Sequence, residues 1–186
     1  MPIETFNIIA TIGSMLIGIF GITAIFLSFS NKKTQFSAFV SRKAYLIGFL
    51  ITLGAVIMSL IYSDIYKYPP CVLCWYQRIF IYPQVVLFGL AMIKKYPKFL
   101  VAQINLALTT IGGAFSLYHV IITYTNFNPI PCPAAVSCTQ RFVFTFGFST
   151  IPLMAMFLFV GLLGVYFMLK RQSDSDLSTD TKQKTF

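Results

Sequence analysis

Long runs of apolar residues, separated by short polar segments, dominate the chain. Five of these runs are long enough to cross a bilayer core of roughly 30 Å, which takes about 20 apolar residues in a helix. They cover residues 6–29, 44–63, 75–93, 99–124 and 150–169. The pattern therefore predicts an all-α integral membrane protein with five membrane-spanning helices.

Composition and charge agree with a membrane protein and exclude one class of partner. The 186 residues are 57% hydrophobic and 10% charged, which is unlike a soluble domain. The pI near 9.5 is compatible with a nucleic-acid partner. However, the basic residues occur in short clusters between the apolar runs and form no contiguous patch or recognition motif, so we expect no nucleic-acid binding. The predicted partner is the lipid bilayer.

The distribution of Lys and Arg predicts how the helices cross the membrane. Eleven of the fourteen lie in segments on one side of the predicted spans: Lys32, Lys33, Arg42, Lys43, Lys94, Lys95, Lys98, Lys170, Arg171, Lys182 and Lys184. Only Lys67, Arg78 and Arg141 lie on the other side. Because an excess of Lys and Arg marks the cytoplasmic side, we expect the N-terminus and the loop of residues 125–149 to face outward. The C-terminus is then cytoplasmic.

The first apolar run is predicted to be a retained span and not a cleaved signal peptide. Its flank, MPIETFN, carries Glu4 and no basic residue, the run exceeds the usual signal-peptide core, and no small-residue cleavage pattern follows. Ala10, Ser14 and Gly18 recur every four residues, a stripe that lets helices approach closely in lipid. At the other end, residues 171–186 have the composition of a disordered cytoplasmic tail.

All four cysteines lie in segments predicted to face outward. Cys71 and Cys74 form a C-x2-C pair just before the third run, and Cys132 and Cys138 form a C-x5-C pair in the loop before the fifth. Disulfides persist outside the cytoplasm, and an even number of cysteines in two close pairs favours redox chemistry.

Other interpretations of the cysteines remain. Static disulfides would close very short loops and constrain little chain, a four-cysteine zinc site is disfavoured by the C-x5-C spacing, and inert thiols fit badly beside prolines. A membrane scaffold or receptor with disulfide-stapled outer loops is the main alternative function, and a metal-handling membrane protein is a second. Haem held by two histidines is disfavoured, because His119 is the only histidine.

The first pair lies where the start of a helix favours a thiolate. Two prolines, Pro69 and Pro70, precede it, and proline suits the first turn of a helix. The unpaired N–H groups and the positive end of the helix dipole favour a thiolate there. Arg78 follows Cys74 by about one turn, roughly 6 Å along the axis, so Cys74 should gain most from its charge. Arg78 either stabilises an anion that appears during turnover or anchors the helix at the interface.

The stretch PCVLCWYQR, with a second cysteine pair in a later outward loop, resembles the DsbB-type quinone-dependent thiol oxidases, especially their short-loop BdbC-like branch. The resemblance covers about residues 44–170 and implies a four-helix transmembrane bundle in a bacterial cytoplasmic membrane. Residues 1–43 then add an N-terminal transmembrane helix and a basic cytoplasmic loop, and residues 171–186 the tail. The vitamin K epoxide reductase kind shares the chemistry, but there the loop cysteines precede the membrane C-x-x-C.

The resemblance also implies roles for the cysteines and for Arg78. Cys71 and Cys74 match the pair beside the quinone, with Cys74 as the thiolate that attacks the ring or forms a charge-transfer contact with it. Arg78 matches the arginine beside the quinone. Cys132 and Cys138 match the second pair, of which Cys132 would form the mixed disulfide with an extracytoplasmic thioredoxin-like, DsbA-type protein.

The resemblance further implies a site histidine and a membrane quinone as electron acceptor. His119 lies thirteen residues before Cys132, the offset of a histidine near the quinone, although a satisfied interfacial histidine is equally compatible with its position. The quinone is menaquinone or ubiquinone, and the short loop favours menaquinone. No metal is implied.

Two features depart from the best-known members of the family. Only five residues separate Cys132 and Cys138, so exchange between the loops must follow a different path, and the attacking cysteine is less well defined. The first span lies outside the four-span core and receives no chemical role. The phenylalanines at alternate positions after the second pair are expected to lie in the membrane interface, by lipid anchoring or beside the quinone entrance: Phe142, Phe144, Phe146 and Phe148.

Overall fold

The computed structural model describes residues 2–29, 43–94, 96–125 and 137–184, with side chains described up to residue 174. The elements are α1 (Ile3–Phe29), α3 (Ala44–Leu60), the π-helix η1 (Ile61–Ile65), α4 (Val72–Lys94), α5 (Lys98–Thr125) and α6 (Ile151–Lys184). Five helices, with η1 prolonging α3, are long and apolar enough to cross a membrane. The prediction of an all-α membrane protein with five spans is confirmed.

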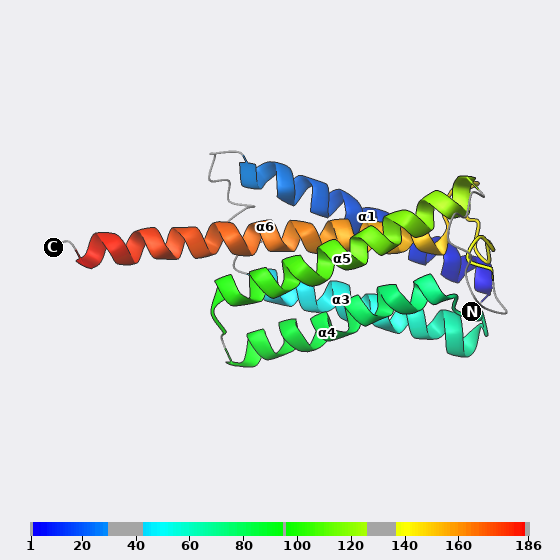
Figure 1. The fold of residues 1–186 in the computed structure, drawn as a ribbon, viewed down its shortest axis with the longest axis horizontal. Coiled ribbons are helices and arrows are strands. Elements are labelled where there is room, and N and C mark those ends of the chain that lie inside the picture. The colour runs from blue at the N-terminus through cyan, green and yellow to red at the C-terminus, as the bar shows by residue number, and fades with distance from the viewer. Residues whose placement is uncertain (1, 30–42, 95, 126–136, 185–186) are drawn as a thin grey trace.

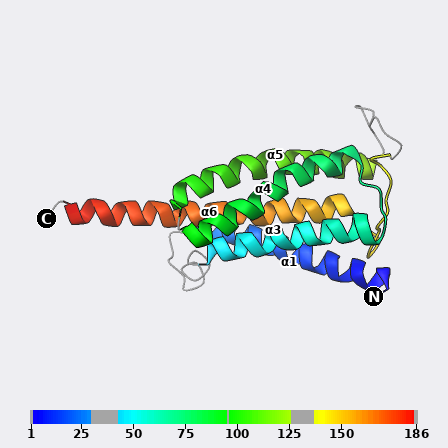
Figure 2. The same cartoon turned by 90° about the horizontal axis from the view of Figure 1, so that it is seen from below.

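Helix α6 lies at the centre of the bundle (Figure 1). It packs extensively against α1 and α5 and touches α3, while α4 lies against α3 and α5. The C-terminal part of α6 projects beyond the bundle (Figure 2). The N-terminus, the connection from η1 to α4 and the segment that leads into α6 lie together at the opposite end (Figure 1). The described cysteines therefore meet at one end of the molecule.

Small residues let α1 approach α6 closely. The predicted stripe of Ala10, Ser14 and Gly18 is buried, and Gly21 is buried one turn further along. A Cβ atom on Gly21 would lie 2.3 Å from the carbonyl oxygen of Val160 on α6. Backbone meets backbone at this point, which is how helices pack tightly in lipid.

Helix α6 is longer than the sequence predicts. We expect a disordered tail over residues 171–186, whereas the helix continues to Lys184. No glycine or proline follows Gly164, so no residue breaks the helix where the apolar run ends. The polar composition marks the end of the apolar span but does not end the helix.

Candidate active site

Cys71 and Cys74 lie where α4 begins. Cys71 directly precedes the helix, and its carbonyl oxygen accepts a hydrogen bond of 3.2 Å from the backbone N–H of Trp75. Neither cysteine is in a disulfide, and their Sγ atoms are 3.2 Å apart. A disulfide bond is about 2 Å long, so a small movement would close it. The predicted position at the start of the third span is confirmed.

His119 reaches this pair from α5. Its Nε2 atom lies 3.7 Å from Sγ of Cys71 and 3.2 Å from the carbonyl oxygen of Cys138. On the other side of the ring, the amide nitrogen of Gln77 lies 3.3 Å from Nδ1. We assign the ring proton to Nε2 from these partners, because an amide N–H donates and Nδ1 must then accept. His119 lies at the dithiol, as predicted for a site residue, and its role stays a prediction.

These contacts favour a thiolate at Cys71. The pKa of Cys71 is lowered to about 4, first because Cys74 hydrogen-bonds its sulfur and then because His119 does so too, and burial only partly offsets this. The sequence predicts Cys74 as the thiolate, because Arg78 follows it. Cys71 gains the stronger help here from the hydrogen bond with Cys74 and then from His119, which lies 48 positions away in the sequence, a contact that spacing does not reveal.

The guanidinium of Arg78 is held beside the pair by α3. Its Nε donates to the hydroxyl of Ser59 at 2.8 Å, and its Nη2 donates to the carbonyl oxygen of Ser59 at 3.0 Å. Its Cζ lies 5.3 Å from the centre of the Trp75 ring. Both partners are neutral, so they orient the guanidinium without neutralising its charge. The arrangement suits a group that stabilises an anion.

Cys138 is buried against the first pair. It belongs to one apolar cluster with Cys71, Leu73 and Ile122. Cys138 is disulfide-bonded, while Cys132, its counterpart in the second pair that the resemblance implies, lies outside the described residues. Because a disulfide-bonded cysteine supplies no thiolate, the structure does not favour a four-cysteine zinc site.

Arg141 fixes the segment that carries Cys138. Its Nε and Nη2 donate to the carbonyl oxygen of Thr123 at 3.2 and 2.8 Å, near the C-terminal end of α5. Its Cζ also lies over the rings of Tyr124 and Phe144, 5.5 and 5.3 Å from their centres. The sequence gives Arg141 no role beyond its charge, whereas here it ties the segment that carries Cys138 to α5, the helix that holds His119.

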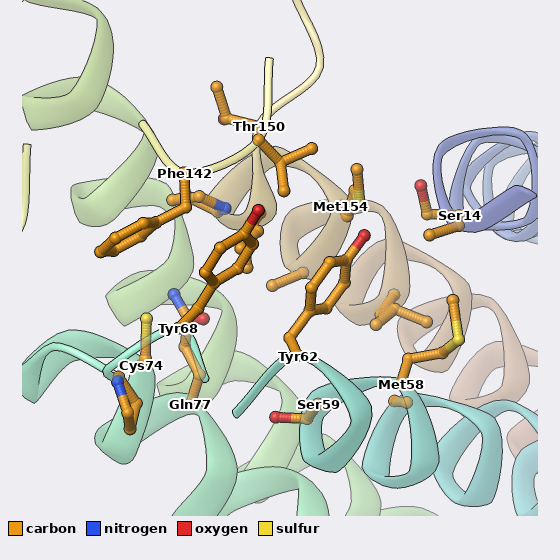
Figure 3. A pocket seen from close by; sticks show the side chains of 18 of the residues that line it. Ser14, Met58, Ser59, Tyr62, Tyr68, Cys74, Gln77, Phe142, Thr150 and Met154 are labelled. Atoms are coloured by element: carbon orange, nitrogen blue, oxygen red, sulfur yellow. The ribbon is translucent and has the colours of Figure 1, made fainter. Parts of the chain in front are cut away.

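A cavity of about 340 Å³ lies beside the dithiol (Figure 3). Its walls come from α1, α3, η1, the first turns of α4 and α6, and the C-terminal part of α5. The dithiol and its polar neighbours are among the residues that line it: Ser59, Cys71, Cys74, Gln77, Arg78 and His119. A mostly apolar space with a few convergent polar groups is typical of a small-molecule site. These residues fit a flat, lipid-soluble quinone ring, with a dithiol as electron donor and N–H groups for the ring oxygens.

A row of aromatic rings covers one end of this cavity. Phe6 contacts Tyr62 with ring centres 5.1 Å apart, Tyr62 stacks on Tyr68 at 6.1 Å, and Tyr68 stacks on Phe142 at 5.0 Å. Tyr62, Tyr68 and Phe142 line the cavity from three segments, and Figure 3 shows all three. Tyr62 lies in η1, and π-helical turns are frequent at functional sites. The other three phenylalanines of the predicted interfacial segment stay exposed: Phe144, Phe146 and Phe148.

The same atoms have the chemistry of a metal site. One ligand atom each from Cys71, Cys74 and His119 lie within 4.8 Å of one another. Two thiolates and an imidazole suit zinc, with a fourth position left open. A metal bound here would block the redox chemistry of the pair, because the thiolates would be its ligands.

Sequence reasoning did not single out Gln77, Ser59 or Tyr62. Gln77 offered a signal, because it follows Cys74 by three positions in PCVLCWYQR and three-residue spacing puts two side chains on one face of a helix. Ser59 and Tyr62 offered none. They reach the site only because α3 packs against α4.

Comparison with known proteins gives one consistent family. The family model described as "Disulfide bond formation protein DsbB" matches residues 41–169. "Probable disulfide formation protein C 1" of Bacillus anthracis is 39% identical over 132 residues, which cover 70% of this chain and 88% of that protein. "SPbeta prophage-derived disulfide bond formation protein B" of Bacillus subtilis (strain 168) is 34% identical over 125 residues, covering 67% and 83%. No solved structure matches the chain.

Proposed function

The chain belongs to the DsbB family of disulfide bond formation proteins, and from that premise we propose that it is a thiol:quinone oxidoreductase. Family membership confirms the predicted resemblance and makes the chain a membrane thiol oxidoreductase. We propose further that it reoxidises an extracytoplasmic thioredoxin-like, DsbA-type protein and passes the electrons to menaquinone or ubiquinone in the bacterial cytoplasmic membrane.

One observation carries this proposal. A free dithiol, with sulfur atoms 3.2 Å apart, borders an apolar cavity that also contains the guanidinium of Arg78. A structural staple needs neither a cavity nor a neighbouring imidazole, so the scaffold alternative leaves this arrangement unexplained. A pair of thiols that reacts with a lipid-soluble oxidant needs both access and an electrostatic partner.

Electrons enter at the second pair. A thiolate of the reduced partner attacks Cys132 and breaks its bond to Cys138, and the partner's second thiol then displaces Cys132, so that the partner leaves oxidised. The two thiols formed in this way reduce the disulfide of Cys71 and Cys74 by the same exchange. The packing of Cys138 against Cys71 supports a short path between the pairs.

The first pair must then lose two electrons. A bound quinone supplies this chemistry by accepting them with two protons. Cys74 passes the electron pair into the cavity, and the thiolate of Cys71 bonds to the Cys74 sulfur to close the disulfide. The proton of the Cys74 thiol leaves with the electrons, and solvent supplies the second proton. Arg78 stabilises the negative charge that enters the cavity. His119 holds the Cys71 thiolate until the bond forms.

The proposal also assigns parts of the chain. Residues 44–170 form the oxidase domain, residues 1–43 add a helix and a basic loop, and residues 171–186 form a tail. The N-terminus and both cysteine pairs face outward and the C-terminus faces the cytoplasm, as eleven of fourteen Lys and Arg residues indicate.

The test mixes purified protein with a reduced thioredoxin-like protein and a soluble quinone, and follows quinone absorbance. Wild type should reduce the quinone, and Cys74→Ser should abolish the reaction because the electron donor is lost. Arg78→Lys should keep the charge but raise the KM for quinone about tenfold, since the planar fork that holds Ser59 and Trp75 is lost. Unchanged turnover in Cys74→Ser would remove the proposed electron path.

A thiol-trapping arm separates the relay from the alternatives. When quinone is withdrawn, a relay accumulates reduced Cys71 and Cys74, whereas a static staple stays oxidised. A metal site would protect these thiols until a chelator is added.

A further inference from the structure

The first helix lies outside the region that matches the family, yet it forms one wall of the cavity. The match covers residues 41–169, and α1 covers Ile3–Phe29. Ile9, Gly13 and Ile17 line the cavity at successive turns of α1. Figure 3 shows Ser14 of the same helix across the cavity from α4. This chain therefore adds a wall that the four-helix core does not supply.

Helix α3 forms the opposite wall through Leu50, Gly54 and Met58. The extensive contacts of α1 are with α6, and α3 is not among the described helices against which α1 packs extensively. A Cβ atom added to Gly13 or to Gly54 would meet nothing within 4 Å. The two walls enclose a slot that runs from Ile9 to Ile17 and from Leu50 to Met58, nine residues of each helix. Eight steps of 1.5 Å make it about 12 Å long.

The slot opens sideways, toward lipid. Ile9 and Leu50 line it and are 53% and 57% exposed, so it reaches the outer surface of the bundle. At the dithiol end α1 is tied to its neighbours. The hydroxyl of Tyr62 in η1 donates to Asn7 at 2.9 Å, and the hydroxyl of Thr11 donates to that of Ser149, just before α6, at 3.2 Å. The exposed side chains of Ile9 and Leu50 belong to membrane-spanning helices, so the slot gives a ligand an entrance from the bilayer.

We propose that the slot between α1 and α3 holds the isoprenoid chain of the quinone whose ring lies at Cys74 and Arg78. This inference rests on the proposed function. The slot continues the same cavity, its walls are apolar, and a chain attached to a ring at the dithiol must leave through an opening that faces lipid. Helix α1 therefore supplies one wall of the space proposed for the isoprenoid chain.

The test fills the slot and measures binding. Gly13→Phe and Gly54→Phe add a ring where the structure has open space. Trp75, the only tryptophan, stacks with Arg78, so a quinone bound there should quench its fluorescence. Lipid is as apolar as the slot, so the chain gains only packing, and each variant should weaken binding of a prenylated naphthoquinone by about tenfold. Binding of the same ring without its chain should stay within about twofold of wild type.

Ile12→Phe is the matched control. Ile12 is 47% exposed, precedes Gly13 on the same helix and does not line the cavity, so both quinones should bind this variant as they bind wild type. If the glycine variants lose affinity equally for both quinones, or for neither, the proposal that the slot holds the isoprenoid chain is overturned. A wild type that neither binds nor reduces either quinone overturns the proposed function and the slot together.

A second measurement needs no substitution. A prenylated naphthoquinone with a diazirine in its chain is photolysed in nanodiscs with wild-type protein, and the labelled peptides are identified. We expect labels on α1 and α3, reduced at least fivefold by excess unlabelled prenylated quinone. Labels confined to other helices would overturn the inference. A diazirine phospholipid is tested in parallel, and labelling of the slot by this lipid but not by the quinone would assign the slot to lipid and also overturn the inference.

Discussion

His119 and Gln77 act together on Cys71. The Gln77 amide accounts for the proton on Nε2 of His119, and that nitrogen faces the Cys71 sulfur at 3.7 Å. With its pKa lowered to about 4, Cys71 is a thiolate at neutral pH and becomes a thiol only as the pH falls through that value. A stabilised thiolate also stabilises the reduced pair, which makes its disulfide a stronger oxidant.

The prediction at this scale concerns His119→Ala. Reduced wild type should show a loss of thiolate ultraviolet absorbance with its midpoint near pH 4. The variant loses one of the two hydrogen bonds to the sulfur, so its midpoint should move up, while Cys74 still keeps it below the ordinary value for a thiol. Cys71→Ser, the control, should lack this transition. An unchanged midpoint in His119→Ala would mean that the imidazole does not act on Cys71.

At the scale of helices, α1 packs on the bundle through glycines that lie close to α6. Gly21 has no room for a side chain, because the nearest atom to an added Cβ is a backbone oxygen that cannot turn away. Gly13, two turns earlier on the same helix, has open space beside it. The two positions therefore allow the same substitution to be compared in two environments.

Gly21→Ala should destabilise the protein by roughly 1–3 kcal/mol, the usual cost of overpacking. Gly13→Ala should be neutral or stabilise it by up to about 1 kcal/mol, because alanine favours the helix. Unfolding of both variants in the same detergent gives the comparison. Equal stability for the two would show that α1 does not depend on backbone contact with α6.

The helices could be predicted because the apolar runs are long and each ends in polar or basic residues. Residues 6–29 and 99–124 match α1 and α5 to within a few positions. The continuation of α6 and the π-helical turn of η1 could not, since neither has a hydropathy signal. The sequence also did not predict which helix packs against α1, because small residues indicate close packing but do not identify the neighbouring helix.

For the whole molecule, local motifs revealed the chemistry and tertiary packing completed the site. PCVLCWYQR already indicated the first cysteine pair and its arginine. The contacts of His119 with Cys71 and of Arg78 with Ser59 join segments 48 and 19 positions apart, so no spacing rule finds them. The wall that α1 adds to the cavity depends on the arrangement of the whole bundle.

Orientation is the property of the whole molecule on which the function depends. Five spans put the two ends of the chain on opposite faces, and the basic residues predict a cytoplasmic C-terminus. A C-terminal epitope tag should therefore resist protease in intact protoplasts and be digested in inside-out vesicles, while an N-terminal tag behaves in the opposite way. Digestion of the C-terminal tag in intact protoplasts would put both cysteine pairs in the cytoplasm. There the glutathione and thioredoxin systems keep thiols reduced, so the relay would have no extracytoplasmic partner to oxidise.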